Sequence, residues 1–339
     1  MNMQRKLKPI VFYSFFNPVH QGHIELANKE FERTGRPILF TPLPASCSQV
    51  PCPSDDERLA MLRIALKGQN PAFEIDTETM KRDGFDLYMD GYLGFPANRK
   101  PLMPSGDVGD EDPLHACLPF ESVRVKQERP MQEGVRSFAS FLENEEERAY
   151  IEEKRLYCVG HLARLLKSEH RLQHSLSVAH LAYEIALSNH YMAPGLAYLA
   201  GLLHDCGKHC DRKKELEVMK EAFPGLTEIY PEWAWHQFVG SYMVEAEFGI
   251  HNGFVQEAIR YHATGRKRMS PLAKIIYAAD KIEPLRGYDS SSMIEECKKD
   301  YEKGFLTVLS ANRDYLTEKG YKVDNPSTKE CFDFYLGDK

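Results

Sequence analysis

Residues 196–208 read Leu-Ala-Tyr-Leu-Ala-Gly-Leu-Leu-His-Asp-Cys-Gly-Lys, and this stretch is apolar nearly all round until it reaches His204 and Asp205. An apolar segment of this length predicts a helix that is buried in the core of its domain. A charged aspartate there is costly unless it is paired or binds a metal ion. We therefore expect this helix to deliver His204 and Asp205 to a metal site inside a helical domain.

Four further residues with metal-binding side chains accompany this pair along the C-terminal half of the chain. His174 shares a helical face with apolar residues, and His262 and Asp280 follow apolar residues at helical spacing. A helical bundle can assemble an internal metal site from side chains on several helices. The complete predicted ligand set is His174, His204, Asp205, His236, His262 and Asp280.

The residue types in this set indicate the chemistry of the site. Six ligands are too many for one tetrahedral ion and sufficient for two octahedral ions that share a carboxylate. Imidazoles and carboxylates suit Fe, Mn, Co or Zn, and the absence of Cys from the set argues against a structural zinc site. Because two adjacent ions can activate a bridging water and hold a phosphoryl group, the set predicts a hydrolytic centre with one or two divalent ions.

The composition indicates a soluble chain of two domains. Its 339 residues exceed an average domain, 42% of them are apolar, and the net charge is −7. We expect no nucleic-acid partner, since no basic block is present, and no membrane span, since no apolar run is long enough. The eight irregularly spaced cysteines and the lack of a secretory signal predict reduced thiols in a cytoplasmic protein.

The chain changes character along its length. Residues 1–150 are predicted to form an α/β domain with strands at 8–16 and 36–43 and helices at 22–33 and 55–67. Residues 94–134, rich in Pro and Gly, predict a long irregular segment. Residues 151–339 are predicted to form an all-α bundle, with helical periodicity over 145–168, 171–189, 194–208, 213–222, 232–248, 253–262, 270–283 and 291–319.

Cationic residues lie close in sequence to two of the predicted ligands. Lys208 follows His204 by one helical turn, so it could reach a phosphate oxygen or offset the helix macrodipole. The three cations at 266–268 follow His262, and they could hold a polyphosphate or form a solvated loop. The residues alone leave both alternatives open for each group.

Four runs of the helical domain are Gln-His-Ser-Leu-Ser-Val-Ala at 173–179, Gly-Leu-Leu-His-Asp-Cys-Gly-Lys at 201–208, Ala-Ile-Arg-Tyr-His-Ala-Thr-Gly at 258–265 and Ile-Tyr-Ala-Ala-Asp-Lys-Ile-Glu-Pro-Leu-Arg at 276–286. These runs resemble the HD-superfamily phosphohydrolases, and the last two resemble the YqeK branch of symmetrical diadenosine tetraphosphatases. The resemblance implies an HD-domain bundle that uses iron to cleave diadenosine tetraphosphate into two ADP. A similar ligand order also occurs in HD-type oxygenases.

The resemblance implies roles for individual residues. His174, His204, Asp205 and Asp280 would ligate the primary ion, with His236 and His262 completing a second ion or a phosphate contact. The inclusion of His236 rests on the resemblance more than on helical periodicity. Asp205 and Lys208 are the expected catalytic residues, with Asp205 orienting the attacking water. The expected substrate contacts are Lys208, Thr264, Gly265, Arg266 and Arg286.

The run Phe-Asn-Pro-Val-His-Gln-Gly-His at 16–23 follows an expected strand and opens an expected helix. His20 and His23 could donate to phosphate oxygens at the helix N-terminus, or merely cap the helix. The run resembles the His-x-Gly-His signature of nucleotidyltransferases, and its surroundings resemble bacterial nicotinate-mononucleotide adenylyltransferases of NAD biosynthesis. The resemblance implies a Rossmann-like fold in which Asn17, His20 and His23 contact a nucleotide.

The N-terminal domain also departs from that family. Phe-Asp-Leu-Tyr at 85–88 replaces a serine- and threonine-rich helix start, the following strand is missing, and the late phosphate-binding motif is absent. Residues 148–157 nevertheless resemble the family's C-terminal tail. We therefore expect a truncated nucleotidyltransferase-like domain fused to the HD domain.

Four functional alternatives follow. The leading prediction is metal-dependent hydrolysis of a small nucleotide by the helical domain. A second makes the chain bifunctional, with adenylyl transfer in residues 1–150, and a third makes that domain a module that only binds adenylates. The fourth is an HD-type oxygenase, which would consume O₂. The sequence leaves open whether the chain forms a homodimer.

Overall fold

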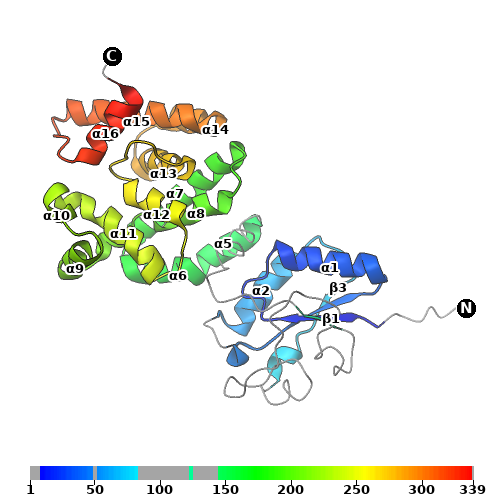
Figure 1. The fold of residues 1–339 in the computed structure, drawn as a ribbon. Coiled ribbons are helices and arrows are strands. Elements are labelled where there is room, and N and C mark those ends of the chain that lie inside the picture. The colour runs from blue at the N-terminus through cyan, green and yellow to red at the C-terminus, as the bar shows by residue number, and fades with distance from the viewer. Residues whose placement is uncertain (1–7, 49–51, 83–121, 125–143, 338–339) are drawn as a thin grey trace, which may run out of the picture. The chain divides into compact units, whose positions relative to one another are not determined.

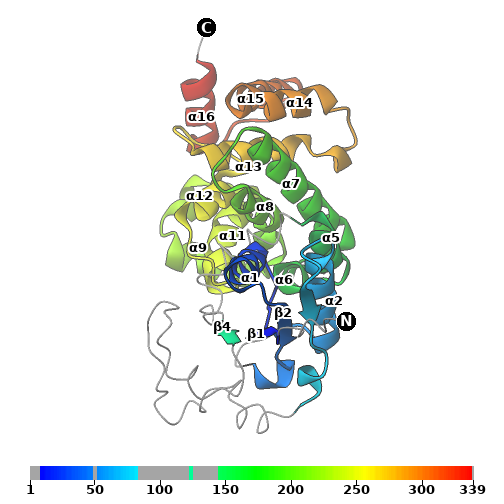
Figure 2. The same ribbon diagram turned by 90° about the vertical axis from the view of Figure 1, so that its right-hand side faces the viewer.

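The computed structural model describes residues 8–48, 52–82, 122–124 and 144–337. Contacts divide the chain into two compact units, Met1–Tyr157 and Cys158–Lys339, whose main elements are labelled in Figures 1 and 2. The predicted boundary between residues 150 and 151 falls inside helix α5, Glu145–Glu153, whereas the division between the units falls after that helix. No helix in these described ranges is long and apolar enough to cross a membrane.

The first unit is built on a parallel sheet with the strand order β3-β2-β1-β4. Its main elements are β1 Ile10–Ser14, α1 Gln21–Thr34, β2 Ile38–Pro42, α2 Asp55–Leu66, β3 Phe73–Ile75, β4 Ser122–Arg124 and α5. The ring of Phe12 packs against those of Phe16 and Phe40, with centroids 5.6 and 5.1 Å away. The predicted α/β class of this unit is confirmed, and its buried aromatic residues connect the sheet to the start of the first crossover.

The sheet contains a strand, β4, that the sequence does not predict. Strand β4 lies within residues 94–134 and pairs parallel with β1, with Val11 opposite Ser122. The prediction that this whole segment is irregular is therefore wrong at β4. Three residues are too few to show an alternating pattern, so the strand is defined by backbone pairing that the sequence does not reveal. The run at 85–88 lies outside the described residues.

The second unit is the predicted all-α bundle. Its α-helices are α6 Tyr157–Leu166, α7 Glu169–Ser188, α8 Pro194–Leu203, α9 Arg212–Ala222, α10 Leu226–Ile229, α11 Trp235–Ala246, α12 Gly253–Tyr261, α13 Pro271–Ile282, α14 Ser291–Lys299, α15 Tyr301–Glu318 and α16 Pro326–Leu336. Figures 1 and 2 show α13 at the centre, packed against α7, α8 and α12 and against α14 and α15. This central helix carries Asp280 in its last turn.

Several predicted helices are shorter than expected. The predicted helix 145–168 is divided between α5 and α6, where Arg155 and Tyr157 both have a φ of 52°. The predicted helix 291–319 is divided at Asp300, because its side chain accepts from the backbone N–H groups that begin α15. The predicted helix 194–208 ends at Leu203, and Cys206–His209 forms a separate 3-10 turn. Helix α16 was not predicted.

Candidate metal centre

Five helices bring the six predicted ligands into one buried cluster. His174 lies within α7, His204 and Asp205 follow α8, His236 lies in the first turn of α11, His262 follows α12, and Asp280 lies in α13. All of them are buried except His174, which is half-buried. We call His174, His204 and Asp280 the first ligand group, and His236 and His262 the second ligand group.

Two glycines allow the helices to approach closely enough to form this cluster. A Cβ on Gly201 would lie 2.8 Å from the Cα of Ala179 in α7. A Cβ on Gly207 would lie 2.2 Å from the carbonyl oxygen of His236 in α11. Because the packed backbone cannot accept such contacts, a side chain at either position would push the segment that carries Asp205 away from its neighbours.

Asp205 lies between the two ligand groups. Its Oδ2 is 3.5 Å from Nε2 of His204 and 3.9 Å from Nε2 of His174. Its Oδ1 is 3.3 Å from Nε2 of His262 and 3.7 Å from Nε2 of His236. The two carboxylate oxygens of one residue therefore face two separate sets of imidazole nitrogens.

Asp280 completes the first ligand group. Its Oδ1 lies 3.4 Å from Nε2 of His174 and 3.6 Å from Nε2 of His204. Ligand atoms of these three residues lie within 4.8 Å of one another, as do those of His204, Asp205 and His262. The arrangement fits a divalent-cation site formed by these side chains.

The four histidines direct Nε2 into the cluster because Nδ1 is engaged elsewhere. In three of them, Nδ1 lies 2.7–2.8 Å from a carbonyl oxygen three residues earlier in the chain. In His174, Nδ1 lies 2.9 Å from Oε1 of Glu283. Since carbonyl and carboxylate oxygens accept here, each Nδ1 carries a proton, and each ring presents a lone pair on Nε2 when it is neutral.

The cluster contains buried polar atoms that a cation would satisfy. Nε2 of His236 lies 3.2 Å from Nε2 of His262, so two lone pairs face each other. Nε2 of His204 and Oδ1 of Asp205 are buried without a hydrogen-bond partner. Such atoms are rare in folded proteins unless an ion or a water binds them. The donor set therefore fits divalent metal ions.

The pKa values of four ligands shift in the direction that favours metal binding, and that of His174 shifts in the opposite direction. Burial lowers the pKa of His236 to about 3 and also lowers the pKa of His262, so both imidazoles are neutral. Burial alone would raise the pKa of Asp205 and Asp280, but nearby imidazoles and cations hold both carboxyls well below their usual range. Burial opposes protonation of His174 as well, yet two carboxylates raise its pKa overall. Neutral imidazole and ionised carboxylate are the metal-binding forms.

Three cationic side chains flank the two aspartates. Nζ of Lys208 lies 2.7 Å from Oδ2 of Asp205, and Arg286 donates to Oδ1 of Asp280. Nζ of Lys281 lies 3.6 Å from Oδ2 of Asp280. Lys208 and Arg286 were predicted substrate contacts, and the structure brings both to the cluster. Lys281 was missed, although its place directly after a ligand was an available signal.

The other residues predicted to contact the substrate lie in the loop after α12, and they make contacts within the protein. Thr264 is 1% exposed and hydrogen-bonds the buried side chain of Gln237. Gly265 has a φ of 67° and packs against Cys331 of α16. The guanidinium of Arg266 lies 5.0 Å from the ring centroid of Tyr261. Contact of these three residues with substrate stays a prediction.

The N-terminal histidines form a site of another kind. His20 caps α1, and its backbone N–H donates to Nδ1 of His23 at 3.1 Å. The two ring centroids are 3.8 Å apart, and the ring of His23 also packs against Phe16. Both metal-type groupings found among the described residues lie in the second unit. Nucleotide contact by Asn17, His20 and His23 stays a prediction.

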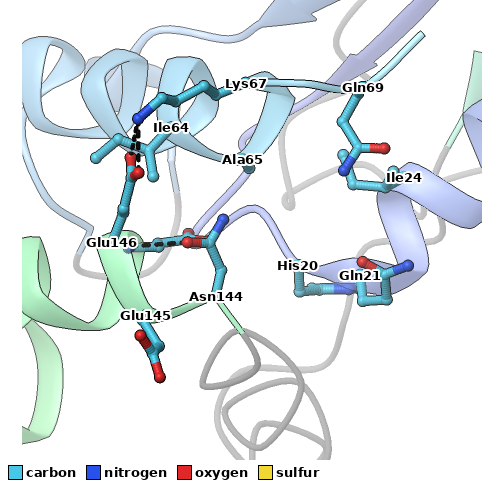
Figure 3. Close-up of a pocket in the computed structure, with 11 residues that line it drawn as sticks. His20, Gln21, Ile24, Ile64, Ala65, Lys67, Gln69, Asn144, Glu145 and Glu146 are labelled. Atoms are coloured by element: carbon cyan, nitrogen blue, oxygen red, sulfur yellow. Dashed lines mark hydrogen bonds and ion pairs between the residues drawn. The ribbon is translucent and has the colours of Figure 1, made fainter.

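A cavity of about 610 Å³ lies beside His20 in the first unit. Figure 3 shows Gln21 and Ile24 of α1 on one side of it, and the ion pair between Lys67 and Glu146 on the other. The cavity offers space for a small molecule next to the His-x-Gly-His run.

Comparisons with known proteins agree with the two-part organisation. Residues 171–285 match the HD domain family, and residues 11–101 match the Cytidylyltransferase-like family. The "Probable nicotinate-nucleotide adenylyltransferase/Ap4A hydrolase" of Mycoplasma pneumoniae is 27% identical over 340 residues, which cover 88% of this chain and 97% of that protein.

Two further similarities concern the helical unit. The "Bis(5′-nucleosyl)-tetraphosphatase, symmetrical" of Bacillus subtilis is 31% identical over 160 residues, or 46% of this chain and 84% of that protein. A crystal structure of a predicted HD superfamily hydrolase involved in NAD metabolism from Clostridium acetobutylicum is 28% identical and has a TM-score of 0.46, with 52% of this chain and 94% of that chain covered. The chain belongs to the HD-superfamily phosphohydrolases of the symmetrical bis(5′-nucleosyl)-tetraphosphatase family, fused to a cytidylyltransferase-like domain.

Proposed function

We propose that the second unit hydrolyses nucleotide phosphoanhydrides and cleaves diadenosine tetraphosphate symmetrically into two ADP. The observation that carries this proposal is the position of Asp205, whose two oxygens face the two ligand groups. The names of the relatives in Bacillus subtilis and Mycoplasma pneumoniae support the substrate. In this reaction one water is added as the central P–O–P bridge breaks, so one ADP receives the water oxygen.

The ligands would hold two ions, with the first ligand group around Oδ2 of Asp205 and the second around Oδ1. When bound, such ions lower the pKa of water and neutralise charge on phosphoryl oxygens. We propose iron as the metal, while Mn, Co and Zn suit the same ligands. Lys208 and Arg286, both partly exposed, contact phosphate oxygens of the substrate, and Asp205 orients the attacking water.

The test combines metal analysis of the purified protein with product analysis. The protein is incubated with diadenosine tetraphosphate and Fe²⁺, Mn²⁺, Co²⁺ or Zn²⁺ in ¹⁸O-labelled water. We expect two ADP, one of which carries the label. Formation of ATP and AMP would contradict symmetrical cleavage, and no turnover with any of these ions would contradict the hydrolase.

We propose adenylyl transfer by the first unit as a second activity. The arrangement of His20 and His23 at the N-terminus of α1, beside the cavity, favours it. A protein supplied with ATP, Mg²⁺ and nicotinate mononucleotide should then release the dinucleotide and pyrophosphate. ATP binding by calorimetry without any product would instead select a domain that only binds adenylates.

We further propose a cytoplasmic location, a homodimer, and a functional boundary between residues 150 and 151. All cysteines in the described ranges are free, as in proteins of reducing compartments. Cell fractionation tests the location, and sedimentation analysis of the purified protein tests the dimer. A separately expressed segment 151–339 that retains hydrolysis would support the boundary.

A further inference from the structure

Glu283 differs from the other groups that support the histidine ligands. His204, His236 and His262 each engage Nδ1 with a backbone carbonyl of their own segment, at 2.7, 2.8 and 2.7 Å. His174 instead engages Nδ1 with a carboxylate from another part of the chain, Oε1 of Glu283 at 2.9 Å. His174 is thus the one ligand among these four whose Nδ1 partner is a carboxylate.

The carboxylate of Glu283 is itself held on both oxygens. Oε1 faces His174, and Oε2 accepts from the backbone N–H of Leu285 at 2.7 Å. Its side chain is 1% exposed, so water does not compete for either contact. Glu283 directly follows α13 and lies three residues after the ligand Asp280. The short segment from Asp280 to Glu283 therefore supplies one ligand of the first group and the carboxylate that contacts another ligand, His174.

We propose that Glu283 is the positioning residue of the first ligand group. Its carboxylate fixes the ring orientation and tautomer of His174 and increases the electron density on Nε2, which strengthens binding of a cation there. Neither His236 nor His262 has its Nδ1 on a carboxylate. The two ions therefore depend unequally on Glu283. This inference rests on the proposed metal centre.

The test is a titration of the metal-free full chain with Mn²⁺. Binding is measured by calorimetry and by the electron paramagnetic resonance signal of free Mn²⁺. We expect Glu283→Ala to weaken one of two Mn²⁺ sites by about 10- to 100-fold and to leave the other unchanged. Glu283→Gln retains an oxygen that can accept from Nδ1 but loses the charge, so it should weaken the same site less. Glu295→Gln, at a glutamate of α14 whose side chain is 76% exposed, is the matched control and should change neither site.

Four results would overturn the inference. Wild-type affinity at both sites in Glu283→Ala would exclude a positioning role. Equal weakening of both sites, together with a lower Tm of the metal-free protein, would show a general structural role. If Glu283→Ala does not fold, unchanged affinities in Glu283→Gln decide against the inference. A wild-type chain that binds no Mn²⁺ would overturn the metal centre as well, which separates the two failures.

Discussion

The two units of this chain use histidine in opposite ways, and the difference lies in Nδ1. In the second unit, Nδ1 of each clustered histidine donates to an oxygen, so Nε2 offers a lone pair to a cation. In the first unit, Nδ1 of His23 accepts from the backbone N–H of His20. With Nδ1 accepting, the ring proton of His23 lies on Nε2, from which it can donate a hydrogen bond. The partner of Nδ1 therefore distinguishes the histidines of the two units.

The largest expected effect comes from removal of the shared ligands. We expect the double variant His204→Ala, Asp205→Ala to lose hydrolysis of diadenosine tetraphosphate by at least about 10³-fold, because bound ions supply several kcal/mol of transition-state stabilisation. Its activity is compared with that of His251→Ala, at an exposed histidine of the same unit. Full hydrolysis by the double variant in the presence of metal would contradict the assignment of the histidine cluster of the second unit as the metal centre.

The next effect concerns the close approach that builds the metal centre. Gly207→Ala should lower the free energy of unfolding of the second unit by about 1–3 kcal/mol, because the new Cβ meets the backbone of His236. Gly253→Ala is the matched control, since a Cβ at the start of α12 meets nothing within 4 Å. Chemical denaturation of both variants measures the difference. Equal free energies of unfolding for the two variants would show that the segment at Gly207 can move to accept a Cβ without loss of stability.

The two units should also respond to pH with opposite sign. Burial raises the pKa of Glu147 in α5 from 4.5 to about 8, so the folded first unit favours the protonated form. The contribution of protonated Glu147 to stability is fully present below the pKa that this residue has in the unfolded chain. This contribution is lost as the pH rises to about 8. In the second unit, the lowered pKa values of Asp205 and Asp280 give stability that is lost in acid.

Glu147→Gln tests the alkaline part of this comparison. Its amide does not ionise, so the variant should lose less stability than the wild type between about pH 5 and pH 9. Thermal unfolding of the full chain at several pH values follows the transition of the first unit. If the stability of the variant and that of the wild type fall in parallel with pH, a group other than Glu147 causes the loss of stability at alkaline pH.

The smallest effect is expected for His23→Ala on hydrolysis. The residue belongs to the first unit and the predicted metal ligands belong to the second, so the rate of ADP formation should stay within about twofold of wild type. Adenylyl transfer measured in the same preparation should be lost. A large fall in hydrolysis would mean that the two units do not act independently.

Much of the metal centre could be predicted from the sequence because its ligands lie in long periodic helices. His174 and Asp280 share helix faces with apolar residues, so their inward direction follows from spacing. Glu283 could not be recognised in this way, because its contact with His174 joins residues 109 positions apart. Strand β4 was missed for a similar reason: its three residues are defined by pairing with β1 and carry no local pattern.

Anomalous diffraction from crystals of the metal-loaded protein tests the central claim most directly. The account predicts two peaks, one among His174, His204, Asp280 and Oδ2 of Asp205, and one among His236, His262 and Oδ1 of Asp205. No peak at Asp205, or an ion bound by other residues, would contradict it.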